Sequence, residues 1–169
     1  MIPVECIFCK IARKEIKTEI IYEDESSLAF LDINPISPGH TVVIPKKHSE
    51  TILDMDDDEI GPMFIAVKRA TEMLKDALSP DAFNIGINHG RKAGQGIDHV
   101  HVHIIPRFEG DGGGSIHTIV RNPPKESIEE MAERIKSASK SGEEPKESVE
   151  EVEEERTGEK EQDLDKLHR

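Results

Sequence analysis

Cysteine is scarce in this sequence, and the long apolar runs of membrane proteins are missing. The 169 residues include two cysteines, Cys6 and Cys9, which are too few for a disulfide framework. No apolar stretch reaches the roughly 18 residues that suggest a membrane-spanning helix. Residues 1–6 also lack the basic segment and apolar core of a secretory signal. We therefore expect a cytoplasmic protein with no membrane partner.

Positive charge is also in short supply, since the formal net charge is −13. Such a chain repels nucleic acid, so we expect no DNA or RNA partner, although a local site can still attract a small anion. Residues 137–169 hold 12 acidic and 6 basic residues and few large apolar groups. That composition cannot offset the entropy of ordering. We expect a folded domain over 1–136 and an acidic low-complexity tail over 137–169, either disordered or a lone exposed helix.

Hydrophobic periodicity predicts an α+β fold for the domain. Apolar residues at helical spacing follow an acidic run and predict a long helix over 56–78. A short helix is expected within 6–15, and Ser127 with Glu130 forms a capping-box pattern before a third helix. Five strands are expected in an antiparallel sheet, at 20–23, 27–31, 40–44, 83–88 and 100–105. We expect Pro45 and Pro106 to end two of these strands, and residues 116–120 to form a short extended segment.

Histidines alternate with apolar residues from position 99 to position 103. Side chains alternate between the two faces of a strand, so His99, His101 and His103 should share one face. Three imidazoles in a row make a poor packing surface, which indicates a function. Two chemistries are open at this point: histidines on a strand can bind zinc, and an imidazole can act as a nucleophile near neutral pH.

This histidine run resembles the signature of the histidine triad superfamily of nucleotide hydrolases and transferases. The similarity extends over about residues 4–111, and several separate blocks carry it. These blocks are Cys6–Ile11, Ala29–Ile33, Pro38–His40, Ile44–His48, Asn88, Gly94–Gly96 and His99–Ile105. The resemblance implies the histidine triad fold, in which a five-stranded antiparallel sheet carries a long helix and a short N-terminal helix. It also implies a homodimer formed through the long helix and a sheet edge.

The resemblance implies a role for each of three histidines. His101 would be the nucleophile, attacking the α-phosphorus of a purine nucleotide substrate and carrying the nucleotidyl group until water removes it. The backbone carbonyl of a neighbouring histidine, or His40, would orient the His101 ring, because a nucleophilic imidazole must be held in one tautomer. His103 would donate a hydrogen bond to a phosphate oxygen.

The resemblance also implies a set of substrate-binding residues. Asp32 would accept hydrogen bonds from the ribose hydroxyls, although a turn-forming role before Asn34 is an alternative. Asn88, Gly94, Gln95 and Gly96 would surround the phosphate, since glycines let the backbone approach an anion. The apolar wall of the base pocket would come from Ile7, Phe8, Phe30, Leu31 and Ile33, each of which could equally be plain core.

The spacing of the two cysteines is typical both of half a metal site and of a redox pair, and it does not distinguish between these two functions. In many bacterial and archaeal relatives of the histidine triad type, two histidines complete the site. Here those are His48, after the Ile44–Lys47 block, and His99. The resemblance therefore implies a structural zinc ion held by Cys6, Cys9, His48 and His99.

The chain departs from the family pattern at Gly96, where many members carry a serine or threonine that assists the leaving group. Lys92 or water could take over that role. His103 stands where the uridylyltransferase branch has glutamine, which favours hydrolysis over transfer. The expected activity is hydrolysis of nucleoside phosphoramidates or related nucleotidyl substrates.

Three alternatives remain at this stage. Arg107 and Asp111 lie in a segment similar to the branch that cleaves dinucleoside polyphosphates such as diadenosine tetraphosphate. A catalytic zinc ion on His99, His101 and His103 is a second possibility. A nucleotide-binding interaction protein with vestigial activity is the third.

Overall fold

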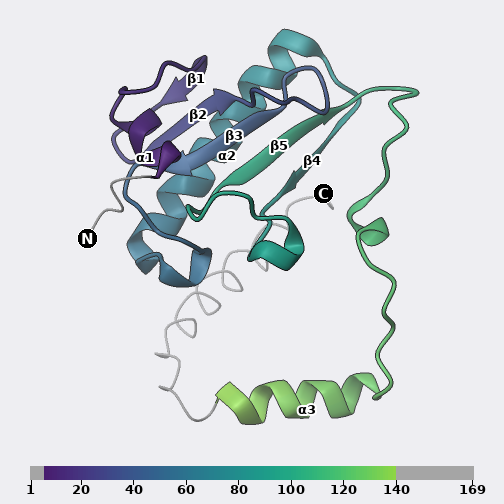
Figure 1. Cartoon of the computed structure of the whole chain (residues 1–169). Coiled ribbons are helices and arrows are strands. Elements are labelled where there is room, and N and C mark those ends of the chain that lie inside the picture. Colours follow the sequence, from purple (N-terminus) through teal and green to yellow (C-terminus); the bar gives the residue numbers. More distant parts are fainter. Residues whose placement is uncertain (1–5, 140–169) are drawn as a thin grey trace, which may run out of the picture. The chain divides into compact units, whose positions relative to one another are not determined.

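The computed structural model describes residues 6–139 and confirms the α+β class (Figure 1). Its helices and strands are short, apart from one long helix. In chain order they are α1 (Ile7–Ala12), β1 (Ile20–Glu23), β2 (Ser27–Leu31), β3 (Thr41–Pro45), the 3₁₀ turn η1 (Ile52–Asp54), α2 (Asp57–Leu78), β4 (Ala82–Gly86), η2 (Arg91–Ala93), β5 (Val102–Arg107), η3 (Ile116–Thr118) and α3 (Ile128–Ser139). The expected tail over 137–169 lies mostly outside the described residues, and its state stays a prediction.

The five strands form one antiparallel sheet, as the sequence predicted, and their order is β1-β2-β3-β5-β4. The last strand in the chain, β5, lies between β3 and β4. His103 of β5 is therefore flanked by Val42 on β3 and by Gly86 on β4, inside the sheet rather than at an edge. His99 and His101 were expected on the same strand, but both precede β5.

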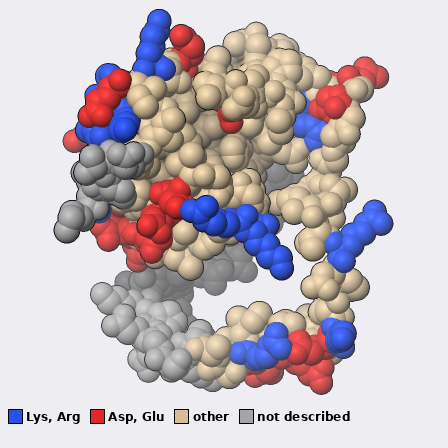
Figure 2. All heavy atoms as spheres, in the orientation of Figure 1, with Lys and Arg blue, Asp and Glu red and all other residues tan. Residues whose placement is uncertain are grey.

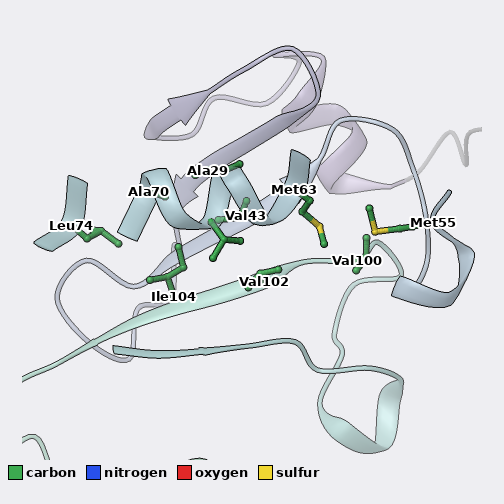
Figure 3. Close-up of a cluster of buried hydrophobic side chains, with 11 residues drawn as sticks. Ala29, Val43, Met55, Met63, Ala70, Leu74, Val100, Val102 and Ile104 are labelled. Carbon is green, nitrogen blue, oxygen red and sulfur yellow. The ribbon is translucent and has the colours of Figure 1, made fainter. Parts of the chain in front are cut away.

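The two faces of the sheet carry different helices. On one face, α2 packs Met63, Ala66 and Leu74 into the larger core cluster, which also contains Val102 and Ile104 of β5 (Figure 3). On the other face, Ile11 of α1 belongs to a smaller core cluster, whose other members are Leu28, Phe30, Val42 and Ile44 of the sheet. Because residues alternate along β5, His103 faces away from α2. Phe8 of α1 packs against the rings of His99 and His101, which precede the strand. They lie on the face that carries α1.

Several boundaries differ from the expected ones. β5 begins at Val102, because the Val100 amide donates to the Ser49 carbonyl instead of joining the ladder. The same strand continues through Pro106, whose carbonyl accepts a hydrogen bond from the Ser37 hydroxyl. β4 ends at Gly86, which leaves Asn88 in the following loop. Residues 116–118 form a 3₁₀ turn rather than an extended segment.

The chain separates into two compact units at Val120/Arg121, and the expected domain boundary at residue 136 stays a prediction. In the second unit, α3 begins with the predicted capping box: the Glu130 amide donates to the Ser127 hydroxyl and the Glu130 carboxylate accepts from the Ser127 amide. Within residues 6–139, no helix combines the length and apolarity that a membrane crossing demands. The apolar side chains of Phe64, Ile65 and Met73 on α2 are exposed, and dimerisation through this helix remains a prediction.

Gly39 and Gly61 should respond differently to replacement by alanine. Gly39 has a φ of +78°, and a Cβ there would meet Leu78 and Leu74 of α2. We expect Gly39→Ala to lower the free energy of unfolding by about 2 kcal/mol. Gly61 is exposed within α2 and a Cβ there meets no atom within 4 Å outside its chain neighbours, but the following Pro62 disfavours a helical residue with a Cβ. This restriction opposes the gain in helix propensity, so Gly61→Ala should change the free energy of unfolding by less than about 1 kcal/mol. Denaturant unfolding of both variants measures the contrast, and equal effects would contradict it.

Candidate active site and metal-ligand cluster

Four side chains converge between α1 and the sheet: Cys6, Cys9, His48 and His99. Their ligand atoms all lie within 4.8 Å of one another. The Cys6 sulfur is 3.5 Å from His99 Nδ1, the Cys9 sulfur is 3.4 Å from His48 Nδ1 and 3.6 Å from His99 Nδ1, and the two Nδ1 atoms are 3.3 Å apart. A tetrahedral zinc site with ordinary bond lengths has edges of about 3.6 Å for S···N and about 3.4 Å for N···N. The donor atoms therefore have the spacing of a four-ligand metal site.

The surroundings of these ligands favour a bound cation. The His99 Nε2–H group donates to the Pro45 carbonyl at 2.9 Å, which leaves the Nδ1 lone pair directed at the cysteines. Burial lowers the pKa of His99 to about 4, so the ring is neutral at pH 7 and able to bind a metal. Burial, and then the neighbouring Cys6, raise the pKa of the Cys9 thiol to about 11. A cation at the site would lower the pKa of this thiol again, because it stabilises the thiolate.

His101 is buried and is held by the main chain of a metal-ligand residue. Its Nδ1–H group donates to the His99 carbonyl at 2.7 Å. Of the two orienting groups expected for this ring, the structure selects the carbonyl. The ring of Phe8 lies edge-on against both His99 and His101, at centroid distances of 5.9 Å and 5.2 Å. His101 is thus fixed in the tautomer that keeps the lone pair on Nε2.

His40 contacts His103 rather than His101. The Ile36 amide donates to His40 Nδ1 at 3.4 Å, which assigns the His40 proton to Nε2. His40 Nε2 lies 3.0 Å from His103 Nδ1 and donates to it. The His103 proton is then on Nε2, available to a ligand. Burial lowers the pKa of His103 to about 4, and lowers the pKa of His40 although Asp32 opposes that shift. Both rings are neutral at pH 7.

Asp32 has the turn-forming role considered for it, and its second carboxylate oxygen is not used in that turn. One carboxylate oxygen accepts a hydrogen bond from the Asn34 amide at 2.8 Å, which is the turn-forming arrangement. The other oxygen lies 3.8 Å from His40 Nδ1. Asp32, Leu31 and His40 line a shallow pocket of about 440 Å³ beside the β2–β3 loop. One oxygen of Asp32 is therefore placed beside the histidines.

Gln95 does not occupy the position expected for a phosphate ligand. Its amide oxygen accepts from the Gly90 amide at 2.7 Å, and its NH₂ group donates to the carbonyls of Glu50 and Ile97. The side chain is buried and holds the loop in shape instead. Gly94, at a φ of +98°, lies beside the Asn88 side chain, and Gly96 borders open space. Lys92 is exposed in η2.

The five apolar residues expected around the base are placed unequally. Phe8 packs on Phe30 at 5.7 Å between centroids, and Phe30 belongs to the smaller core cluster. Leu31 lines the shallow pocket, and Ile7 is partly exposed. Ile33 is 84% exposed and lines neither that pocket nor the larger cavity described next, so the structure does not bring it to the site.

A larger cavity of about 580 Å³ lies over β4 and β5 on the histidine face. His103 and Asn88 are in its wall, together with residues that the sequence did not single out, such as Gly86 and Ile36. A glycine within an apolar strand was the available signal, because such glycines often mark a close approach. Arg107 also lines the cavity, and Asp111 binds its guanidinium through both carboxylate oxygens.

Residues 13–110 match the family model described as the HIT domain, which covers more than half of the chain. The chain belongs to the HIT family. It is 56% identical over 107 residues to an uncharacterised HIT-like protein of Methanocaldococcus jannaschii, covering 63% of this chain and 82% of the relative. An adenosine 5′-monophosphoramidase of Schizosaccharomyces pombe is 37% identical over 137 residues, covering 81% of this chain and the whole relative.

Solved HIT structures share the fold. A crystal structure of a HIT family member from Bacillus subtilis superposes with a TM-score of 0.73 at 38% identity, covering 83% of this chain and 99% of that one.

Among the described residues, His99, His101 and His103 do not form one metal-ligand group. His99 Nδ1 faces the cysteines, whereas the Nδ1 atoms of His101 and His103 are hydrogen-bonded to protein. The geometry thus disfavours a catalytic zinc ion on these three histidines of the HIT chain.

His103 should make stability depend on pH. Free histidine titrates near pH 6.5, so between that value and about 4 the unfolded chain binds more protons than the folded one. The contribution of neutral His103 is complete above pH 6.5 and is lost as the pH falls toward 4. We expect the free energy of unfolding to fall less over this window in His103→Gln than in the wild type, measured by urea unfolding. His117→Gln replaces an exposed histidine and should keep the wild-type dependence.

Proposed function

We propose that the protein is a nucleotide hydrolase that uses His101 as a nucleophile on the α-phosphorus of nucleoside phosphoramidates or related nucleotidyl substrates. The observation that carries this proposal is the hydrogen bond from His101 Nδ1 to the His99 carbonyl. It leaves an unprotonated Nε2 on a buried ring whose orientation is fixed. His103 presents a proton on the same face, so a lone pair and a hydrogen-bond donor lie side by side. This combination supports a catalytic role for His101 rather than a purely structural one.

In the first step, His101 Nε2 attacks the α-phosphorus, and an Nε2–P bond forms while the bond to the leaving group breaks. For a phosphoramidate, the departing amine takes up a proton from water and leaves as the neutral amine. The His103 Nε2–H group donates to a phosphate oxygen on which charge develops. The developing positive charge on His101 is stabilised by the His99 carbonyl, which accepts the Nδ1 proton throughout.

In the second step, water attacks the same phosphorus, and the Nε2–P bond breaks. One water proton is released to solvent or to the product, and His101 returns to its starting tautomer because the His99 carbonyl has never released Nδ1–H. Asp32 would bind a ribose hydroxyl through the oxygen that Asn34 does not use. Asn88 and the amides around Gly94 and Gly96 would face the phosphate. The protein would therefore form a covalent nucleotidyl-histidine intermediate.

The choice of an adenine nucleotide is supported by relatives whose names state their activity. Besides the monophosphoramidase of Schizosaccharomyces pombe, an adenylylsulfatase of Arabidopsis thaliana is 41% identical over 107 residues, covering 63% of this chain and 54% of the relative. Both names describe cleavage at an adenylyl group. Adenosine 5′-phosphoramidate is thus the first substrate to test, with diadenosine tetraphosphate as the alternative.

Replacing His101 tests the nucleophile directly. We expect His101→Ala to lower kcat on adenosine 5′-phosphoramidate by at least about 1,000-fold, because no other group can form the covalent intermediate. Rapid quench of the wild type with labelled substrate should trap a nucleotidyl adduct that maps to His101. His117→Ala serves as a control with wild-type activity. Unchanged turnover in His101→Ala would instead support a nucleotide-binding protein without this chemistry.

We also propose that Cys6, Cys9, His48 and His99 hold a structural zinc ion. The edge lengths of the four-atom cluster support this, and a bound ion would supply a cross-link between α1 and the sheet. The purified wild type should contain about one zinc ion per chain by metal analysis. Cys9→Ser and His48→Ala should lose most of it and melt at a lower temperature, while His117→Ala keeps both. A wild type without zinc, prepared reduced and free of chelator, would contradict the proposal.

A further inference from the structure

The loop between β2 and β3, residues 32–40, is attached to β5 by the side chain of Ser37. The Ser37 hydroxyl donates to the Pro106 carbonyl at 2.6 Å. Pro106 is fully buried, and a buried carbonyl without a donor is costly. The pairing of β3 with β5 extends along β5 only to Ile104, so the ladder does not supply that donor. The Ser37 hydroxyl supplies it and thereby fixes the loop on the sheet.

The same loop controls the His40 ring through its main chain. The Ile36 amide, next to Ser37, donates to His40 Nδ1 at 3.4 Å. The Ser37 carbonyl accepts a hydrogen bond from the His40 amide at 3.0 Å. A hydrogen bond of 3.4 Å is long, so a small displacement of the loop is enough to break it. The attachment of Ser37 to β5 therefore decides whether the Ile36 amide reaches the ring.

Asp32 competes with the Ile36 amide for His40 Nδ1. The second carboxylate oxygen of Asp32 lies 3.8 Å from that nitrogen. The shallow pocket around Asp32, which is formed within the described part of the chain, has no lysine or arginine in its lining. Figure 2 shows a largely uncharged surface over the sheet on the face in view. A proton on His40 Nδ1 would be attracted to this carboxylate, whereas the Ile36 amide opposes it because two N–H groups would face each other.

The His40 and His103 rings can therefore hold their two protons in two arrangements. Their facing nitrogens are 3.0 Å apart. In the first arrangement, His40 Nε2–H donates to His103 Nδ1, and His103 keeps its proton on Nε2. In the second, the His40 proton is on Nδ1 toward Asp32, and His103 Nδ1–H donates to His40 Nε2. His103 Nε2 then carries a lone pair, which repels a phosphate oxygen instead of donating to it.

We propose that Ser37 is a positioning residue: its hydroxyl holds the loop on β5, keeps the Ile36 amide on His40 Nδ1 and so maintains the arrangement in which His103 donates through Nε2. The consequence for the reaction rests on the proposed function, in which His103 donates to the phosphate. The consequence for the protons is independent of it, because it depends only on the contacts of the loop. Ser37 acts through the main chain of its neighbour and not on the substrate.

Nitrogen NMR spectra of the imidazole rings at pH 7 test the proposal, because they distinguish a protonated ring nitrogen from an unprotonated one. We expect Nε2 to be protonated on both His40 and His103 in the wild type. In Ser37→Ala, the second arrangement should become the major one. Because kcat/KM refers to the free protein, its value for adenosine 5′-phosphoramidate should fall as the first arrangement is depleted, about tenfold if about one molecule in ten retains it.

Three further variants isolate the effect of the hydroxyl. Ser37→Thr keeps a hydroxyl and should retain the wild-type spectrum and kcat/KM. Thr71→Val removes a hydroxyl that donates to the Val67 carbonyl within α2, and should also leave both unchanged. In Ser37→Ala/Asp32→Asn the carboxylate that attracts the proton is absent, so the protons should return to Nε2 of both rings. A general loss of stability would not produce that return.

The outcomes separate this proposal from the proposed function. A wild type with the His40 proton on Nδ1, or a Ser37→Ala spectrum identical to that of the wild type, would overturn the proposal whatever the activity. Shifted protons with unchanged kcat/KM would overturn the role of Ser37 in the reaction and the donation by His103, while His101 remains the nucleophile. If the wild type does not turn over the substrate, the proposed function fails and the spectra still decide where the protons lie. Thermal melts check folding, and Ser37→Cys, whose thiol is a weak donor, replaces Ser37→Ala if that variant does not fold.

Discussion

One hydrogen bond, from His101 Nδ1 to the His99 carbonyl, connects the two halves of the site. His99 contributes its side chain to the metal-ligand cluster and its main chain to the orientation of His101. Displacing the His99 ring would therefore move the carbonyl that fixes the tautomer of His101. Phe8 adds a second connection, because it lies between the two cysteines in sequence and packs against His101. The cluster of Cys6, Cys9, His48 and His99 therefore influences the orientation of His101 without supplying an atom to the proposed reaction.

A second chain of hydrogen bonds sets the proton on His103. It starts at the Ile36 amide, passes through His40 and ends with a proton on His103 Nε2. Burial reinforces the assignment, because it keeps both rings neutral. In the proposed mechanism, neutral imidazoles beside a substrate phosphate provide a directed donor without a permanent charge. The two neighbouring histidines are consequently specialised by their partners: His101 keeps a lone pair and His103 keeps a proton.

The sequence predicted the sheet and the long helix because these depend on residue type and spacing, whereas the cluster of Cys6, Cys9, His48 and His99 was expected from the resemblance to the histidine triad family. Cys6 and Cys9 lie one turn apart, and apolar alternation marks each strand. The sequence was not informative where hydrogen bonds to main-chain groups determine the position of a side chain. Gln95 was expected at the phosphate, but its amide is used by the carbonyls of Glu50 and Ile97 and the amide of Gly90, which no side-chain pattern reveals. The Ile36 amide that fixes His40 is equally invisible in sequence. Ile33 is exposed because it lies beyond the end of β2, in a loop where Asn34 is exposed too.

Arg107 shows that a resemblance in sequence must be checked against the charged groups that surround a residue in the structure. The segment that contains it is similar to the branch that cleaves dinucleoside polyphosphates, and this similarity suggested a polyphosphate substrate. Its guanidinium is instead bound by Asp111, and Gly114 supplies a further acceptor, so its role is to hold the segment after β5 against the cavity. A phosphate could compete for it only by breaking the two hydrogen bonds that Arg107 donates to Asp111, which form the bidentate ion pair, and the one that it donates to the Gly114 carbonyl.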